Sequence, residues 1–223
     1  MYAALGTRPD IAFATQHLSQ FTNSYGPEHW TAIKHILRYL IGTWDDGILF
    51  RKEARLELQI YVDADYANRS DAKSISGYVA MLGGGSIAWS ARKQQTVSLS
   101  TMEAEYIALT EGAKELIWLR NTLQELGFDQ SRPTSIQCDN IGVITLSHDA
   151  TYHARTKHIN VAYHFIRKKV TSNEVSLTYV RSKENLADLM TKGLEGHQFR
   201  YLRRKLGVTE VRGSVGMEKD ATA

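Results

Sequence analysis

Four acidic residues stand out as candidates for shared chemistry, and the first lies at the end of a predicted strand. From Leu56 to Asp65 apolar and polar residues alternate, which is the period of a strand with one buried face. Asp63 and Asp65 occupy polar positions near its end, although aspartate is depleted in strands. The pattern predicts a strand that ends in a carboxylate, and it leaves open which of the two aspartates has the function.

A long helix is predicted after Ser100, and helical geometry shows on which side of it each glutamate lies. At 100° per residue, one apolar stripe is formed by Met102, Tyr106, Leu109, Ala113, Leu116 and Leu123. Glu105 lies within this stripe, where an ionised carboxylate is costly unless it is paired or bound to a metal. Glu103 has a structural explanation, because Ser100 and Glu103 form an S-x-x-E capping box. Glu111 and Glu115 are predicted to face solvent, so Glu105 is the candidate.

Two more aspartates follow later in the chain. Asp139 ends the predicted strand "SIQCD", and the carboxyl ends of strands in open α/β sheets carry ligand sites. Asp188 stands near a predicted helix start in "ENLADLMTK", where the helix dipole favours a carboxylate. Each alone has a structural alternative, a turn or cap for Asp139 and a helix start for Asp188.

Taken together, the four acids predict a metal site at one edge of the sheet. Carboxylates that converge without a basic partner repel one another and have raised pKa values. Mg²⁺ resolves this repulsion, because it favours carboxylates and water as ligands. Two such ions about 3.5–4 Å apart activate water and stabilise the leaving oxygen in phosphodiester cleavage. We therefore expect two Mg²⁺ ions, with Mn²⁺ as a substitute, at Glu105, Asp139, Asp188 and one aspartate of the first strand, Asp63 or Asp65.

Composition limits the classes of protein that fit. The chain has 223 residues, 43% hydrophobic and 23% charged, which is a globular composition and not a disordered one. The single cysteine, Cys138, excludes an internal disulfide and fits a reducing compartment. We expect no signal peptide, because the first residues lack its basic and apolar regions, and no membrane span. A net charge of +3 permits a nucleic-acid partner.

The order of predicted elements indicates a mixed sheet flanked by helices in one α/β domain. Helices are expected at 9–22 and 27–41, packed through Leu18, Phe21, Trp30, Ile33 and Leu37, followed by a strand at 47–50. The remaining expected elements are strands at 56–65, within "SISGYVAML", "SIAWSAR" and "QTVSLS", a helix at 101–126, a strand at 135–140, helices at 141–148 and 157–170, a strand at 174–180 and helices over 184–206.

Several of these segments match a known family. The stretches "YVDADYA", "SGYVAMLGGGSIAWSARKQQTVSLSTMEAEYIAL", "CDN", "RTKHINVAYHFIRKKV" and "NLADLMTK" resemble, in the same order, the ribonuclease H region of copia-type retrotransposon Pol polyproteins. Residues 5–50 resemble the thumb and connection of the reverse transcriptase in those polyproteins. The resemblance implies three parts: a reverse transcriptase remnant at 1–55, a ribonuclease H domain at 56–207, and a tail at 208–223 expected to be disordered.

The resemblance also implies a fold, a site and an activity. The fold is the ribonuclease H-like α/β fold, a five-stranded mixed sheet flanked by helices. The family's acidic tetrad falls on Asp63, Glu105, Asp139 and Asp188, and its aromatic-x-Asp pattern in "YVD" favours Asp63 over Asp65. The implied activity is Mg²⁺-dependent hydrolysis of the RNA strand in RNA/DNA hybrids. The implied partners are that hybrid and the rest of a reverse transcriptase, in the cytoplasm, with a virus-like particle or the nucleus as alternatives.

The chain departs from the family pattern in a few places. Many ribonucleases H carry a histidine in the loop before the last aspartate, whereas the loop "VRSKENLAD" has none. Lys183 or a water molecule is the candidate for the histidine's role. The family often shows other residues at Tyr66, Ile75, Asn160 and Gly193, and none of these positions belongs to the tetrad.

Basic residues near the predicted site are candidates for contacts with phosphates, which would make binding depend on salt. These candidates are Arg92, Lys93, Lys157, Arg167 and Lys168. Their usual role is to form a solvated surface. The histidines at 153, 158 and 164 are spaced by five and six positions, which matches neither helical i,i+4 ligation nor a zinc finger.

Three other functions are alternatives to ribonuclease H activity. The "YVDADY" segment differs from the Y-x-D-D hairpin of polymerases, because Ala64 separates its aspartates. We expect no polymerase activity from these residues, since the fingers and palm would need well over a hundred residues before Thr7. An integrase or resolvase fits less well, because those enzymes usually cut DNA with three acids. The remaining alternative is a catalytically silent nucleic-acid-binding or scaffold remnant of a decayed retroelement.

Overall fold

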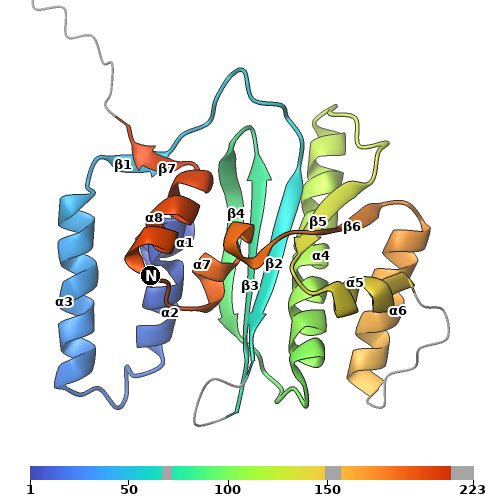
Figure 1. Cartoon of the computed structure of the whole chain (residues 1–223). Helices are drawn as coiled ribbons and strands as arrows, with labels where there is room; N and C mark the ends of the chain where they lie inside the picture. The colour runs from blue at the N-terminus through green and yellow to red at the C-terminus, as the bar shows by residue number, and fades with distance from the viewer. Residues whose placement is uncertain (67–71, 149–156, 212–223) are drawn as a thin grey trace, which may run out of the picture.

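The computed structural model describes residues 1–66, 72–148 and 157–211, and its centre is a five-stranded sheet. The strands run in the order β4-β3-β2-β5-β6 (Figure 1). β2–β3 and β3–β4 are antiparallel pairs, and β2–β5 and β5–β6 are parallel pairs. The bounds are β2 Gln59–Asp65, β3 Ile75–Leu82, β4 Gly85–Lys93, β5 Thr134–Cys138 and β6 Val175–Tyr179. The mixed sheet that the ribonuclease H resemblance implies is confirmed.

The sequence explains the central strand and the adjoining hairpin. Ile60 and Val62 are fully buried in the larger hydrophobic core, as the alternating pattern predicts. Gly83 and Gly84 join β3 to β4 with φ of +61° and +81°, the left-handed values that a two-residue hairpin turn requires. The strand expected in "QTVSLS" is wrong, because residues 95–100 form no strand.

The long helix α4, Thr101–Glu125, covers one face of the sheet. Beyond it lie α5, Ile141–His148, and α6, Lys157–Thr171, on the right of Figure 1. The predicted stripe is largely correct, because Tyr106, Leu109, Ala113 and Leu116 are fully buried. Met102 departs from it and is 37% exposed, since it lies in the first turn, near the helix end.

The opposite face of the sheet is covered by short helices from both ends of the chain. These are α7, Asp188–Thr191, α8, Gly196–Lys205, and α2, Ala12–Ser19. Val79 from β3, Met190, Leu202 and Leu206 form a second hydrophobic core there with Ala12. This second core places α7 on the sheet, which matters because α7 begins with Asp188.

The N-terminal helices pack differently from the prediction. After α1, Tyr2–Gly6, and η1, Pro9–Ile11, the chain reaches α3, Pro27–Gly42, which lies outermost and has no buried residue (Figure 1). Packing through Trp30 and Leu37 is wrong, because both are more than half exposed. Phe21 instead stacks on His29, with ring centroids 4.1 Å apart.

A small second sheet joins the segment after the N-terminal helices to the end of the described chain. β1, Asp46–Ile48, pairs antiparallel with β7, Val208–Glu210. Residues 208–210 therefore form a strand, although they were expected in the tail, and residues 212–223 lie outside the described part. The division of the chain into three parts at 55 and 207 stays a prediction. Within the described residues, no helix has the length and apolar character needed to cross a membrane.

A buried ionic network lies between the N-terminal helices and α8. The guanidinium of Arg8 donates two hydrogen bonds to Asp10, at 2.9 and 2.8 Å. Tyr39 donates its hydroxyl hydrogen to Asp10 at 2.5 Å. Arg203 contacts both the Tyr39 oxygen, at 3.0 Å, and Asp46, at 2.7 Å. We call these five residues the balanced network, because two guanidinium groups face two carboxylates.

Candidate active site

The four predicted acids meet at one end of the central strands. Asp63 lies in β2, Glu105 in the second turn of α4, Asp139 directly after β5, and Asp188 at the start of α7. Oxygens of Asp63, Asp139 and Asp188 lie within 4.8 Å of one another, and so do ligand atoms of Glu105, Cys138 and Asp139. Asp139 belongs to both groups, so it links all four acids into one cluster, which we call the acidic cluster.

The geometry distinguishes the two aspartates of β2. Asp63 is buried and belongs to the acidic cluster. Asp65 is half-buried at the end of the strand and belongs to neither group of potential ligands in the described residues. The structure therefore places Asp63, and not Asp65, among the converging carboxylates.

Burial dominates the electrostatics of the acidic cluster. Desolvation, together with the charges of Asp63 and Asp139, raises the pKa of Glu105 to about 9. Burial and the charge of Asp63 raise the pKa of Asp188 to about 7. The pKa of Asp63 is also raised by burial, although Lys192 and Thr191 oppose that rise. These carboxyl groups are therefore held in an environment that disfavours their negative charge.

A lysine and a threonine that follow Asp188 complete the cluster, and neither was predicted. The ammonium of Lys192 lies 3.0 Å from Asp188 Oδ1 and 3.4 Å from Asp63 Oδ2. The hydroxyl of Thr191 donates a hydrogen bond to Asp63 Oδ2. The expectation that the acids have no basic partner is therefore wrong, although one ammonium cannot neutralise four carboxylates.

Two further residues fix α7 against the sheet. Gly77 pairs with Asp63 across the β2–β3 ladder, and a Cβ atom on Gly77 would lie 2.6 Å from Met190 Cβ. Asn185, fully buried, donates to the carbonyl of Val62 at 2.9 Å. The close approach at Gly77 and the Asn185 hydrogen bond together place Asp188 beside Asp63.

The first turns of α4 separate Glu103 from Glu105. Ser100 Oγ accepts from the backbone N–H of Glu103, at 3.2 Å, as the capping prediction requires. The Glu103 carboxylate turns back to accept from the N–H of Leu99 at 2.7 Å. Glu105 is 6% exposed, and its Oε2 atom is buried without a hydrogen-bond partner in the described structure.

The donor atoms of the acidic cluster fit a hard divalent cation. A buried carboxylate oxygen without a partner is costly, so Glu105 Oε2 is explained if a cation approaches it. The carboxylate oxygens of all four acids match the preference of Mg²⁺ and Mn²⁺ for oxygen. Cys138 lies beside them, but burial raises the pKa of its thiol to about 12, so it stays protonated and is a poor ligand. Asp63, Glu105, Asp139 and Asp188 could therefore hold such ions.

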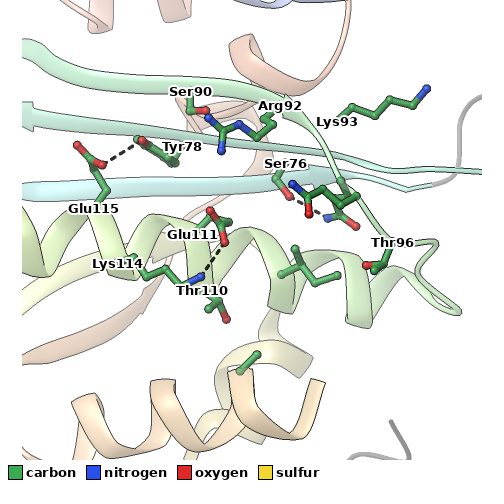
Figure 2. Close-up of a pocket in the computed structure, with 14 residues that line it drawn as sticks. Ser76, Tyr78, Ser90, Arg92, Lys93, Thr96, Thr110, Glu111, Lys114 and Glu115 are labelled. Carbon is green, nitrogen blue, oxygen red and sulfur yellow. Dashed lines mark hydrogen bonds and ion pairs between the residues drawn. The ribbon is translucent and has the colours of Figure 1, made fainter. Parts of the chain in front are cut away.

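A groove of about 620 Å³ runs along β3, β4 and α4. Figure 2 shows Arg92 pointing into this groove near Ser76 and Ser90, with Lys93 extending away from it. Gln94, which lines the groove, donates to Ser76 Oγ and to the carbonyl of Ala104, the residue before Glu105 in the sequence. None of the four acids lines the groove, whose walls come from β3, β4, α4 and the segment 94–96.

Other groove residues carry both signs of charge. Lys114 pairs with Glu111 at 2.9 Å, and Tyr78 donates to Glu115 at 3.2 Å (Figure 2). The prediction that Glu115 only faces solvent is therefore wrong, because it receives the Tyr78 hydrogen bond. Arg92 contributes the guanidinium group of the groove (Figure 2).

The remaining predicted basic residues are spread over the molecule. Lys93 donates to Gln20 at 3.3 Å, on the side of α2. On α6, Arg167 is half-buried and Lys168 is exposed. The side chains of Lys157 and His158, and all of His153, lie outside the described residues. That these basic residues together form one nucleic-acid-binding surface stays a prediction.

Two of the site residues that were not predicted nevertheless have recognisable sequence patterns. Lys192 stands four positions after Asp188, the spacing at which opposite charges meet on a helix. Gly77 is a glycine within a predicted strand, which indicates close approach of another backbone. Asn185 has no comparable pattern, because its hydrogen bond to Val62 joins positions far apart in the sequence.

Comparison with known proteins identifies relatives of the whole described chain. The chain is 44% identical over 209 residues to the retrovirus-related Pol polyprotein from transposon TNT 1-94 of Nicotiana tabacum, covering 93% of this chain and 16% of that protein. It is 42% identical over 211 residues to the Pol polyprotein from transposon RE2 of Arabidopsis thaliana, covering 94% of this chain and 14% of that protein.

A solved structure and the search of family models complete the comparison. The chain is similar to a foamy viral protease-reverse transcriptase in complex with RNA/DNA hybrid, with a TM-score of 0.48, 13% identity and coverage of 87% of this chain and 25% of that one. No protein-family model matches the chain. The identity to the two plant polyproteins shows the family, although the chain spans less than one-fifth of their length. The chain belongs to the copia-type retrotransposon Pol polyproteins.

Proposed function

We propose that the protein is a ribonuclease H, a divalent-metal-dependent endonuclease that hydrolyses the RNA strand of RNA/DNA hybrids. The observation that carries this proposal is the acidic cluster, in which Asp139 links two groups of potential ligands and Glu105 Oε2 has no partner among the described residues. The membership in the Pol polyprotein family supports the choice of a nucleic-acid substrate. The metal in the cell is proposed to be Mg²⁺, with Mn²⁺ as a substitute.

In this proposal Asp63, Glu105, Asp139 and Asp188 hold two ions, which would supply Lewis-acid activation of water and neutralise charge on the phosphate. The water oxygen bonds to phosphorus and releases a proton to solvent, while the bond between phosphorus and the 3′ oxygen breaks. This leaves a 5′-phosphate and a 3′-hydroxyl. The 3′ oxygen takes its proton from solvent, since no histidine precedes Asp188 in its loop. Recognition of the 2′-hydroxyl distinguishes RNA from DNA.

The groove is proposed to hold one strand of the hybrid. Arg92 faces into it from β4, and guanidinium groups pair well with phosphate oxygens. Ser76, Ser90 and Thr96 add hydroxyl groups along the same groove (Figure 2). Contacts of this kind position the backbone without reading sequence, and they weaken as salt concentration rises.

The test compares the wild-type protein with Asp139→Asn on a labelled RNA/DNA hybrid, double-stranded RNA and double-stranded DNA. We expect the wild type to cut only the hybrid, and only with Mg²⁺ or Mn²⁺. Asp139→Asn should lower the rate more than about 100-fold, because loss of a partner outside the ligand shell already costs 10–100-fold. Asp129→Asn is the matched control at an exposed aspartate, and it should cut at the wild-type rate.

Two results would contradict the proposal. If the wild type cuts no substrate with either metal, a catalytically silent nucleic-acid-binding remnant becomes the better explanation. If Asp139→Asn and the wild type cut equally well, the activity belongs to another site or to a contaminant. Circular dichroism of both proteins shows whether the substitution has left the fold intact.

A further inference from the structure

Lys192 occupies a position that a bound metal ion would also require. Its ammonium contacts Asp188 Oδ1 and Asp63 Oδ2, at 3.0 and 3.4 Å. Oxygens of the same two aspartates, with one from Asp139, form a group of potential metal ligands within 4.8 Å of one another. An ammonium and a divalent cation cannot both lie against these oxygens without strong repulsion between like charges.

The two sides of this contact differ in their freedom to move. The side chains of Asp63 and Asp188 are 3% and 8% exposed, whereas that of Lys192 is 36% exposed. Asp63 is also held by Thr191. Lys192 ends α7, where its backbone N–H donates to the carbonyl of Asp188, so its backbone is fixed while its four-carbon side chain reaches toward water. The carboxylates are therefore the fixed part, and the ammonium is the part that can leave.

We propose that Lys192 is a positioning residue with two states. Without a divalent ion, its ammonium holds Asp63 and Asp188 together and limits their mutual repulsion. When an ion binds, it contacts the two carboxylates in place of the ammonium, and the ammonium moves out to solvent. This inference rests on the proposed function only for the binding of a divalent ion at the acidic cluster.

One consequence is that Lys192 lowers the affinity of the cluster for metal while it stabilises the metal-free protein. The ion must replace an existing ion pair before it binds both aspartates. A neutral side chain at 192 removes that competitor and leaves the carboxylates uncompensated. Metal affinity and metal-free stability should therefore change in opposite directions, which a purely structural contact does not predict.

The test measures binding of Mn²⁺ alone, from the electron paramagnetic resonance signal of the free ion. Lys192→Gln should bind Mn²⁺ about fivefold more tightly than the wild type, the size of effect expected from losing one partly exposed ion pair. In EDTA its thermal midpoint should lie below that of the wild type, and saturating Mn²⁺ should raise it by more. Lys34→Gln, at an exposed lysine of α3, is the charge-matched control and should match the wild type in both measurements.

A second variant keeps the inference testable if Lys192→Gln does not fold without metal. Lys192→Arg retains the positive charge in a planar fork that pairs more firmly with carboxylates. It should bind Mn²⁺ more weakly than the wild type. Equal or weaker Mn²⁺ binding by Lys192→Gln, or equal or tighter binding by Lys192→Arg, overturns the inference.

Hybrid cleavage measured on the same preparations separates this inference from the proposed function. If the wild type binds Mn²⁺ and the Lys192 variants shift that binding as expected, but no hybrid is cut, the proposed function fails and the role of Lys192 stands. If the wild type cuts hybrid and the variants leave Mn²⁺ affinity unchanged, only the role of Lys192 fails. A wild type whose Mn²⁺ binding is absent, or is unaffected by Asp139→Asn, contradicts both.

Discussion

The molecule contains two buried ionic clusters of opposite design. In the balanced network, Arg8 and Arg203 face Asp10 and Asp46, and Tyr39 connects them by hydrogen bonds. In the acidic cluster, one ammonium contacts two of the four carboxylates. Each cluster also contains a buried polar atom without a hydrogen-bond partner in the described structure, Arg203 Nε in the balanced network and Glu105 Oε2 in the acidic cluster. Both clusters lie where helices meet β-structure, so burial alone does not distinguish them.

The two clusters differ in net charge, counted over the residues that contact one another within each cluster. Matched charges need no further ligand, and the balanced network is explained by its role in joining the N-terminal helices to α8. Unmatched negative charge is costly in a buried site, and it persists where a cation from outside completes the site. The excess of carboxylates supports the proposal that the acidic cluster is the functional site, whereas the balanced network joins structural elements.

The largest expected effect comes from breaking the balanced network. Asp10→Asn leaves the buried guanidinium of Arg8 without its carboxylate, so we expect the free energy of unfolding to fall by about 3–5 kcal/mol. Urea denaturation measures this change, and Asp129→Asn should stay within about 0.5 kcal/mol of the wild type as the exposed control. The increase in stability on adding Mn²⁺ should be the same in Asp10→Asn as in the wild type. A loss of that increase would show that the two clusters are coupled.

The next effect concerns the glycine that brings α7 to the sheet. A methyl group in Gly77→Ala would meet Met190 and Thr191 at 2.6 and 2.7 Å, so α7 must shift. Overpacking of this kind costs about 1–3 kcal/mol, and here it also moves Asp188 and Lys192 away from Asp63. We expect lower stability and at least about tenfold slower cleavage of hybrid.

Gly193→Ala is the matched control for Gly77→Ala, because a Cβ atom at position 193 would meet nothing within 4 Å. It should leave both stability and cleavage near the wild-type values. Wild-type cleavage by Gly77→Ala would contradict the conclusion that this close approach positions the site.

Much of this arrangement can be predicted from the sequence, and the reason lies in periodicity. The alternation in β2 and the stripe on α4 predict the strand, the helix and the burial of Glu105, because each pattern is local. Asp63 could be separated from Asp65 only by the family pattern or by the structure, since both lie on the polar side of one strand. Asn185 and the balanced network could not be predicted, because their partners are distant in sequence and no period connects them.

The N-terminal helices show the limit of the same method. The stripe of Trp30, Ile33 and Leu37 is a correct helical pattern, but the structure leaves Trp30 and Leu37 largely exposed. An apolar stripe indicates that a helix face favours burial, and it does not indicate which surface covers it. The helix α3 was thus predicted correctly as an element and wrongly in its packing.

A third test concerns the charge of the acidic cluster and the dependence of stability on pH. The pKa of Glu105 is raised to about 9 in the folded protein, above its value in the unfolded chain. The folded state therefore binds this proton more tightly, and the corresponding stability is lost as pH rises toward 9. In EDTA, Glu105→Gln should match the wild type near pH 4.5 and unfold at a higher temperature near pH 9.

Calorimetry at several pH values measures this difference, and Glu125→Gln on the exposed end of α4 is the control. Mn²⁺ should remove the advantage of Glu105→Gln, because the ion compensates the ionised carboxylate of the wild type. If Glu105→Gln is less stable than the wild type across the whole pH range in EDTA, Glu105 is a structural residue.

The last test concerns the reactivity of Cys138, which involves no substitution. Burial raises the pKa of this thiol to about 12, so at pH 7 its thiolate fraction is about a thousandfold below that of an ordinary cysteine. Iodoacetamide should leave the native protein unmodified over hours and alkylate it in urea, as mass spectrometry would show. Rapid alkylation of the native protein would mean that the buried side of the acidic cluster, where Cys138 lies, opens to solvent.

The pairing of β1 with β7 has a consequence for the order of folding during synthesis. Arg203 reaches Asp46 across 157 residues, and the small sheet closes the same loop. Contacts between such distant positions form late, because the intervening chain loses entropy when the loop closes. On a ribosome, β1 can therefore pair with β7 only after almost the whole described chain has been synthesised. The β2–β3–β4 hairpins can pair as soon as they emerge. The acidic cluster is likewise complete only after Asp188 has been made, so a nascent chain has no assembled site until its last helices fold.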